Sequence, residues 1–510
     1  MADSVKPFSP EEAKTILHHL QQPAVFMNMT CAWPVLHWTA ERLSGCFADK
    51  RLRFRLGRKE EINTPLFETQ CSYVEAKLSQ FLNWPLAQSG MDIGPFVEYP
   101  YSDYWAYADY KYIAVLFQDQ PSMFEDVRWC EFGFEGRNGR ESTLWIGTEG
   151  ANTPCHLDTY GCNLVLQVQG RKRWHLFSPE DTASLYPTRV PYEESSVFSQ
   201  VNVLQPDLRR FPAFQKARAH TVTLQPGQVL FVPRHWWHYV ESVDPITVSV
   251  NSWIEMEVDD EARVSEAVTK AVVCAIKSAP SDDNSDNWLN PTEPVSFRLT
   301  EGIFIQPTGG HLLCRHKEGV TSHNENMQYV NLAVRACAQR QMNLCHGKPS
   351  QNLRETRPVK RDSSGQISKN SDPVRDPAPF SVPYGPHLIP VRCQEEDLPG
   401  KRGGTPKDLE VKSSINCAAR IEEDCTVSSD AALRTEPTSA ILHHRKHECS
   451  PSFSQSREPG CADGTLEESG HATITTNDLL DCLVHPDIIS RVAELLLERH
   501  TGRHRTTTSL

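Results

Sequence analysis

Two histidines and one aspartate in this chain have the types and spacing of a metal-binding triad. His156 and Asp158 are separated by one residue, and His238 follows far downstream, at the end of the stretch 233–238. Two imidazoles and one carboxylate form a facial triad, which holds Fe(II) and leaves coordination positions open for chemistry. The same ligands accept other metals, so a cupin-like zinc binder stays an alternative.

The period of a β-strand indicates how these ligands could share one direction. Successive side chains of a strand point to opposite faces, so His156 and Asp158 project from one side and Leu157 from the other. The third ligand, His238, must come from a different strand. An H-x-D pair is a weak signal by itself, and His238 alone could be an ordinary interior histidine.

Short apolar runs around the triad predict the strands that would carry it. Between about residues 141 and 253, turn residues such as Gly170 and the pair 226–227 separate these runs. The predicted strands are 144–146, 163–169, 173–177, 228–232 and 246–253. Many short strands without intervening helices favour a sandwich or barrel, so the expected fold is mainly β with flanking helices (α+β).

Helical patterns flank these strands. Ser9, Pro10 and Glu12 occupy the positions of an N-cap, a first helical residue and a capping-box acid, which predicts a helix start. Apolar residues at helical spacing predict further helices over 259–277, packed against the barrel, and over 326–340.

Composition divides the chain unevenly. Hydrophobic residues make up 39% of the 510 residues, and the 36 prolines crowd towards the C-terminal half, a composition typical of partial disorder. We therefore expect an N-terminal helical and mixed segment packed on the barrel over 1–87, the barrel over 88–255, a helical extension over 256–345, a long disordered linker over 346–470 and amphipathic helices over 471–510.

The expected C-terminal helices present apolar residues that need a cover. Leucines at 479, 480 and 483 precede Pro486, and apolar residues over 488–496 follow at helical spacing. These helices could fold back onto the core, form a homodimer or hold a protein partner, and the sequence does not choose among the three.

Charge and apolar runs limit the kinds of partner. The net charge of −13 argues against direct nucleic-acid binding, which needs a concentrated basic surface. The most basic stretch, 51–56, alternates charged and apolar residues and predicts a strand with a solvated basic face.

No apolar run approaches the roughly 20 residues that cross a bilayer. Without a secretory signal or any C-x-x-C pair among 16 cysteines, we expect reduced thiols and a cytoplasmic, or also nuclear, location.

Lys172 bears on what a metal at the triad would bind. It follows the Gly170 turn within the basic stretch 171–173. An ammonium directed into an apolar barrel is costly unless an anion meets it, and a dicarboxylate cosubstrate would supply that anion. Judged on its own residues, however, this stretch is more simply a solvated basic turn.

Several motifs taken together resemble the Jumonji-C (JmjC) family of iron- and 2-oxoglutarate-dependent oxygenases, and most of all its small hydroxylase branch. The resemblance covers roughly residues 20–275 and depends on 144–158, Asn163, 170–173, 226–227 and 232–238. It implies a double-stranded β-helix, the jelly-roll or cupin-like barrel of that family, and it makes His156, Asp158 and His238 the ligands of Fe(II). His235 precedes the two tryptophans that the ligand should follow, so it is predicted to lie at the surface or behind the ligands.

The same resemblance implies a binding site for the cosubstrate 2-oxoglutarate. Lys172 would pair with its distal carboxylate, helped by the hydroxyl of Thr153, while Asn163 and Asn251 match polar positions that line the pocket. The implied reaction releases succinate and CO2 and hydroxylates the substrate, here a protein side chain.

Two other functions compete with this hypothesis. The chain could be a JmjC scaffold that regulates a protein partner, such as the 27 kDa small heat-shock protein, in the stress response with little or no catalysis. A histone demethylase is the third possibility, because hydroxylation of an N-methyl group leads to loss of that methyl group. The absence from the sequence of the zinc-binding pairs that chromatin readers usually carry argues against it.

Overall fold

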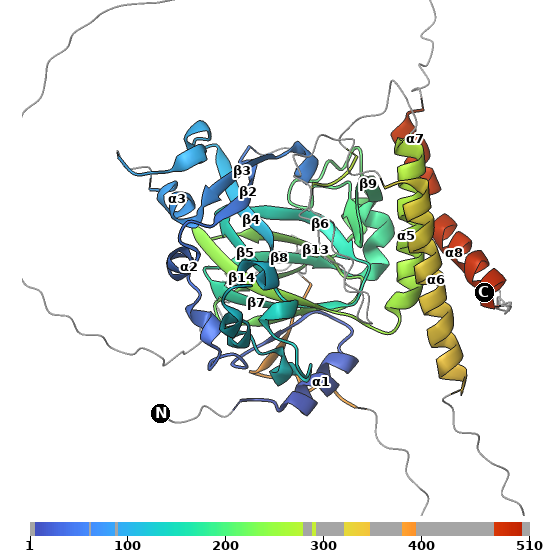
Figure 1. Ribbon diagram of the computed structural model, residues 1–510, viewed down its shortest axis with the longest axis horizontal. Helices are drawn as coiled ribbons and strands as arrows, with labels where there is room; N and C mark the ends of the chain where they lie inside the picture. Colours follow the sequence, from blue (N-terminus) through green and yellow to red (C-terminus); the bar gives the residue numbers. More distant parts are fainter. Residues whose placement is uncertain are drawn as a thin grey trace, which may run out of the picture. The chain divides into compact units, whose positions relative to one another are not determined.

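Two antiparallel β-sheets form the centre of the protein (Figure 1). The structure, a computed structural model, describes residues 6–60, 63–86, 90–278, 288–291, 321–346, 380–393 and 474–501. The larger sheet has nine strands in the order β15-β1-β12-β7-β14-β5-β4-β2-β3, and the smaller has six in the order β11-β8-β13-β6-β10-β9. The predicted fold, a mainly β jelly-roll with flanking helices, is confirmed.

The five strands predicted from apolar runs all form, with ends within two residues of the expected ones. The larger sheet contains β1 (Ala24–Phe26), β2 (Arg51–Arg58), β3 (Ser72–Lys77), β4 (Tyr104–Tyr112), β5 (Thr143–Thr148), β7 (Cys162–Gln169), β12 (Val229–Val232), β14 (Ile246–Ile254) and β15 (Leu388–Pro390). The smaller sheet contains β6 (Asn152–Asp158), β8 (Lys172–Phe177), β9 (Pro187–Glu193), β10 (Ser196–Ser199), β11 (His220–Leu224) and β13 (Trp237–Ser242).

The larger sheet is covered on both faces, which explains its continuous apolar strands. In β7, Leu164 and Leu166 belong to the large apolar cluster that includes the N-terminal helices, whereas Val165 belongs to the cluster that includes Trp174 of the smaller sheet. Side chains of one strand therefore alternate between two apolar layers.

The described residues before β5 form four α-helices: α1 (Pro10–His19), α2 (Ala40–Phe47), α3 (Leu78–Asn83) and α4 (Ile113–Leu116). The predicted capping box opens α1. The Glu12 backbone amide donates to the Ser9 hydroxyl at 3.2 Å, and the Ser9 amide donates to the Glu12 carboxylate at 2.8 Å.

The remaining helices are α5 (Asp259–Lys277), α6 (His323–His346), α7 (Thr476–Leu483) and α8 (Pro486–Thr501), as the apolar spacing predicts. They pack together at one side of the sheets (Figure 1), with α5 in contact with the other three. Val268 and Val273 of α5, Leu480 of α7 and Tyr192 of β9 share one apolar cluster. The C-terminal helices therefore fold back onto the core. None of the described helices is long and apolar enough to cross a membrane.

The expected disordered linker over 346–470 is corrected for residues 380–393. This segment contains β15, which pairs antiparallel with β1 at the edge of the larger sheet, with Ile389 opposite Val25. Leu388 is fully buried in the apolar cluster of the N-terminal helices. By pairing with β1, this short segment satisfies backbone N–H and C=O groups at the edge of the sheet. A three-residue strand is too short to give a recognisable sequence pattern, so the sequence does not predict it. The rest of the expected linker lies outside the described residues.

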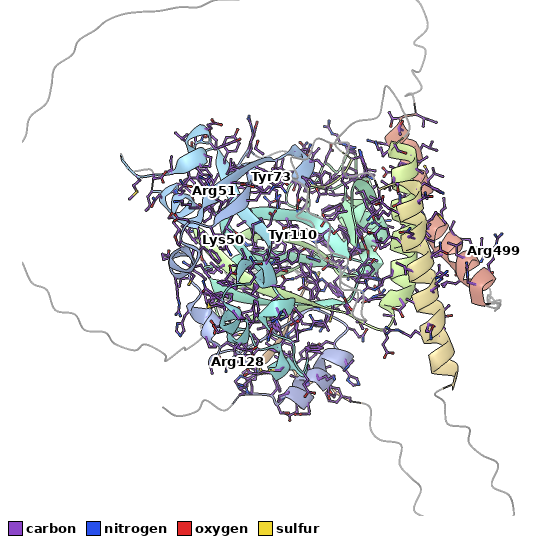
Figure 2. The ribbon with its side chains drawn as sticks, viewed as in Figure 1. Lys50, Arg51, Tyr73, Tyr110, Arg128 and Arg499 are labelled. Carbon is purple, nitrogen blue, oxygen red and sulfur yellow. The ribbon has the colours of Figure 1, made fainter. Side chains whose placement is uncertain are left out.

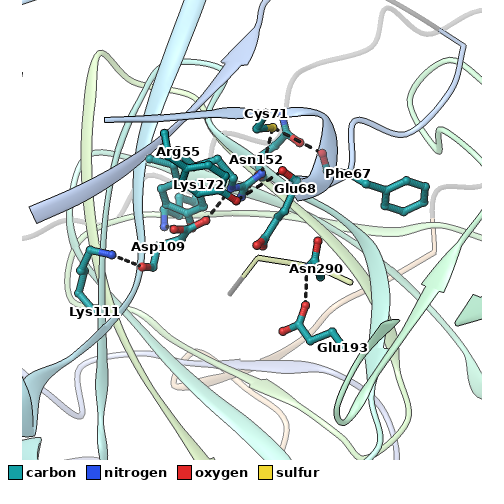
Figure 3. A network of polar contacts seen from close by, with 12 residues as sticks. Arg55, Phe67, Glu68, Cys71, Asp109, Lys111, Asn152, Lys172, Glu193 and Asn290 are labelled. Carbon is teal, nitrogen blue, oxygen red and sulfur yellow. Dashed lines mark hydrogen bonds and ion pairs between the residues drawn. The ribbon is translucent and has the colours of Figure 1, made fainter. Parts of the chain in front are cut away.

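The basic stretch 51–56 forms β2 as predicted, but its basic face is only partly solvated. Arg51 at the start of the strand is exposed (Figure 2). Arg55, however, is fully buried, and its Nε donates to the Asp109 carboxylate at 2.6 Å (Figure 3). The prediction of a solvated face is wrong at Arg55, because β4 supplies an acid inside the fold that neutralises the guanidinium.

Candidate metal centre

His156, Asp158 and His238 come together on the smaller sheet. His156 and Asp158 lie on β6, and His238 lies on β13 in direct register with His156. The Nε2 atoms of His156 and His238 lie 3.8 and 3.9 Å from the oxygens of the Asp158 carboxylate. One potential ligand atom of each residue lies within 4.8 Å of the others, so all three surround a single point.

Neighbouring groups orient each of these side chains. The Nδ1 atom of His156 lies 2.9 Å from the carbonyl oxygen of Pro154, and Nδ1 of His238 lies 2.9 Å from that of Trp236. A hydrogen bond that uses Nδ1 as the donor leaves Nε2 as the free lone pair, which fixes the tautomer suited to metal binding. The indole Nε1 of Trp253 donates to Asp158 Oδ2 at 3.0 Å and holds the carboxylate in turn.

The electrostatics of the site favour the metal-binding forms. Burial, together with the neighbouring His238 ring, lowers the pKa of His156 to about 4, so its imidazole is neutral at physiological pH. A metal binds neutral imidazole and ionised carboxylate. Two buried imidazoles and one carboxylate with converging lone pairs therefore fit a divalent ion that keeps open coordination positions.

Lys172 points into the same interior as the triad rather than into solvent. Its side chain is nearly fully buried, and Nζ donates to the Tyr107 hydroxyl at 3.1 Å and to the Ser249 hydroxyl at 2.8 Å. In the described part of the chain no carboxylate lies within ion-pairing distance of Nζ. Burial lowers the pKa of Lys172 to about 7. The solvated-turn interpretation is thus wrong for Lys172, and it holds only for its exposed neighbours Arg171 and Arg173.

The other predicted pocket residues line one cavity of about 630 Å³ that also contains the triad and Lys172. Thr153 is buried on β6, on the same strand as two triad members. Asn251 on β14 donates its Nδ2 to Asn163 Oδ1 on β7 at 2.9 Å, and its Oδ1 accepts from Trp145 Nε1 at 2.8 Å. The structure therefore brings together every predicted site residue.

His235 lies apart from the triad. Its backbone has a φ of 64°, in the left-handed region, and its Nε2 lies 3.3 Å from the carbonyl oxygen of Thr159. This half-buried position agrees with the prediction that His235 is not a ligand.

Sequence reasoning missed the groups that surround the predicted residues. Tyr107 and Ser249 solvate the Lys172 ammonium, and Trp253 orients Asp158. Each is a single polar or aromatic residue within a strand, so no spacing distinguishes it from an ordinary core position.

Comparison with known proteins agrees with this geometry. Residues 10–260 match the model of the cupin-like domain. The chain is 53% identical to HSPB1-associated protein 1 homolog of Danio rerio, over 98% of this chain and 100% of that protein. It is 46% identical to HSPB1-associated protein 1 of Homo sapiens, over 97% of this chain and 95% of that protein. Lysine-specific demethylase 8 of Xenopus tropicalis is 30% identical over 46% of this chain and 49% of its own length.

Two independent lines of observation meet here. The antiparallel sheets with a His-Asp-His constellation have the architecture expected of a JmjC barrel, and similarity to HSPB1-associated proteins extends over almost the whole chain. The chain therefore belongs to the cupin-like JmjC family, within the group of HSPB1-associated protein 1.

Proposed function

We propose that this protein is an Fe(II)- and 2-oxoglutarate-dependent oxygenase that hydroxylates a side chain of another protein. The observation that carries the proposal is the shared cavity, into which both the triad and an ammonium without a carboxylate partner open. A metal site needs only the triad. A buried, unneutralised lysine beside it is explained by an anionic cosubstrate.

Each residue of the site has a proposed task. His156, Asp158 and His238 would hold Fe(II), and Trp253 keeps the Asp158 carboxylate in place. Lys172 would pair with the distal carboxylate of 2-oxoglutarate. With O2 and 2-oxoglutarate, bound Fe(II) supplies the oxidation of a C–H bond to an alcohol, with release of succinate and CO2.

The polar residues around Lys172 would orient the cosubstrate. Tyr107 lies beside the ammonium and Thr153 lines the same cavity, and both offer hydroxyls to a carboxylate, while Asn163 and Asn251 hold one another across the cavity wall. Because these donors are buried and prearranged, they would bind a dicarboxylate without first having to reorganise.

Succinate formation by the full-length protein supplied with Fe(II) and 2-oxoglutarate tests the proposal. Asp158→Ala should lose metal binding and succinate formation together. Asp244→Ala, which removes a carboxylate paired with Arg171 at the surface, should retain both. Equal succinate formation by the wild type and Asp158→Ala would exclude the triad as the catalytic site.

A second function is favoured by the relatives. The proteins that match over nearly the whole chain carry names that say they associate with HSPB1, a small heat-shock protein. We propose that this chain also binds a small heat-shock protein, in the cytoplasm, and that it acts there in the stress response. Capture of HSPB1 by both the wild type and Asp158→Ala would show binding that does not depend on the metal. Capture by the wild type alone would exclude such a metal-independent adaptor.

Demethylation is a third candidate because a relative that matches about half the chain is named lysine-specific demethylase 8. Mass spectrometry of methylated histone peptides incubated with the protein, Fe(II) and 2-oxoglutarate distinguishes loss of a methyl group from addition of oxygen.

A further inference from the structure

Glu193, the last residue of β9, brings a further acid into the cavity of the triad. Its Oε2 accepts a hydrogen bond from Asn290 Nδ2 at 2.5 Å (Figure 3). No lysine or arginine side chain in the described part of the chain forms an ion pair with it. Burial raises the pKa of Glu193 to about 7, which reflects the same lack of a cation.

Strand register places Glu193 on the same face as the metal centre. Ser196 of β10 lies opposite Glu193 of β9 on one side and opposite Asp158 of β6 on the other. Directly opposed residues point to the same face of a sheet. Two strand spacings separate the backbones of Glu193 and Asp158 by roughly 10 Å, a distance that one long side chain can bridge.

Aromatic rings form another part of the cavity wall. The rings of Tyr110 and Trp145 have centroids 4.7 Å apart, and those of Trp145 and Trp253 lie 6.3 Å apart. Tyr110 lies among the central strands (Figure 2), where β4 changes register between Ala108 and Lys111. Its φ of 52° is unusual for a tyrosine, and the residue lines the cavity. The Tyr110 hydroxyl lowers the pKa of the Glu193 carboxyl, against the larger effect of burial.

The other charged side chains of the cavity already have partners or proposed tasks. Arg137 donates to the Ser252 hydroxyl and the Trp253 carbonyl, and Arg263 pairs with Glu255 at 3.3 Å. Glu194 is paired with Lys270 at 4.0 Å. With Lys172 and Asp158 assigned to cosubstrate and metal, Glu193 is left facing a chamber with aromatic walls.

A half-buried carboxylate in a cavity with aromatic walls has the chemistry of a site for an organic cation. A guanidinium or ammonium would neutralise the carboxylate and lie against the rings, whose faces attract cations. We propose that Glu193 binds the cationic side chain of a lysine or arginine in the protein substrate and so holds that side chain's carbon atoms near the metal. This inference rests on the proposed oxygenase function and names the class of residue on which it acts.

Binding of short capped peptides to the full-length protein, saturated with Mn(II) and 2-oxoglutarate, tests this inference. Four peptides are identical except for lysine, norleucine, arginine or citrulline at the centre. Citrulline keeps the side-chain length of arginine without its charge, and norleucine keeps the four-carbon chain of lysine without its amine. We expect the lysine or the arginine peptide to bind about 10- to 100-fold more tightly than its neutral counterpart. Which pair shows the preference identifies the residue.

Two matched variants assign the preference to one carboxylate. Glu193→Gln should abolish it, whereas Glu194→Gln, the same change at the adjacent glutamate, should leave it in place. Binding of 2-oxoglutarate to both variants checks that the cavity is intact. Equal binding of charged and neutral peptides by the wild type, no measurable binding of any of the four, or an unchanged preference in Glu193→Gln would overturn the proposal.

Succinate measurements separate this inference from the proposed function. A Glu193-dependent preference for a cationic peptide without succinate formation would contradict the oxygenase and leave the cation site standing. Asp158-dependent succinate formation without a preference for cationic peptides would support the oxygenase and contradict the cation site.

Discussion

Two buried cations of this protein, Arg55 and Lys172, have opposite electrostatic environments. Arg55 on β2 donates to the Asp109 carboxylate at 2.6 Å and to the carbonyl oxygen of Asn152 at 2.9 Å. Lys172 on β8 is almost equally buried, but among the described residues it donates only to the hydroxyls of Tyr107 and Ser249. The charge of Arg55 is thus neutralised by an acid inside the fold, whereas that of Lys172 is met only by neutral hydroxyl groups among the described residues.

The pKa values of the two side chains follow from this difference. Burial opposes the charge of both. For Arg55 burial is the largest single influence, but the surrounding groups, Asp109 first and Glu68 next, together outweigh it and hold the pKa well above its usual value. For Lys172 the same acid is a weaker influence, and burial lowers the pKa to about 7. A fold that needs a cation supplies its counter-ion, so the missing counter-ion at Lys172 indicates a ligand.

Removing the counter-ion of Arg55 should have the largest effect on stability. Asp109→Ala leaves a guanidinium buried without its acid, which we expect to lower the free energy of unfolding by about 3–5 kcal/mol. Urea denaturation followed by tryptophan fluorescence measures this change. The double variant Arg55→Met, Asp109→Leu removes both charges and should recover most of the loss. A single variant as stable as the wild type would show that the pair is not a structural unit.

Lys172→Met, unlike Asp109→Ala, should not lower the stability of the protein, but it should strongly weaken the binding of 2-oxoglutarate. It removes an ammonium that lacks a counter-ion, so the protein without cosubstrate should be as stable as the wild type or more so. Its affinity for 2-oxoglutarate should fall by about 2–5 kcal/mol, because the ligand carboxylate loses its cation. Calorimetry with the Mn(II)-loaded protein measures the affinity. Unchanged binding would contradict the assignment of Lys172 to the cosubstrate.

The stability contributed by Lys172 should also depend on pH. Its pKa is about 7 in the folded protein and 10.5 as the ordinary value. Between these values the unfolded chain holds the proton and the folded chain does not, so the free energy of unfolding rises with pH over this range. Below about pH 7 both states are protonated, and the folded protein bears the full cost of the buried charge.

Comparing urea denaturation of the wild type and Lys172→Met at several pH values from about 6 to about 10 isolates this contribution. The wild type should gain stability relative to the variant as the pH rises. Saturating 2-oxoglutarate should reduce the gain, because an anion beside Lys172 raises its pKa. A difference that does not change with pH would mean that Lys172 keeps its proton in the folded protein.

These two cations also show how far sequence reasoning reaches. Alternation in 51–56 predicted the strand that carries Arg55, and the Gly170 turn marked the start of the strand that carries Lys172. The pattern could not predict which basic residue of each stretch turns inward. That depends on acids and hydroxyls from strands distant in sequence, such as Asp109 and Ser249.

The candidate site was predictable to the same degree. The triad and Lys172 were found because they lie in motifs of a known family, and the strand period explained the common direction of His156 and Asp158. Glu193 lies in no such motif, and only the pairing of β9 with β10 and of β10 with β6 brings it to the cavity. Which residues become neighbours in this way depends on the register between strands that are distant in sequence. A local sequence pattern does not specify that register.

The smallest effect is expected beside Lys172, at Arg173. Its side chain is 45% exposed, and it pairs with Glu241 at 3.3 Å on the opposite face of β8. Solvent screens such pairs, so Arg173→Gln should lower the free energy of unfolding by less than about 1 kcal/mol. Affinity for 2-oxoglutarate, measured as for Lys172→Met, should not change, because adjacent side chains of a strand face opposite sides. A marked loss of that affinity would mean that the field of the whole basic stretch 171–173, rather than the single inward ammonium, attracts the cosubstrate.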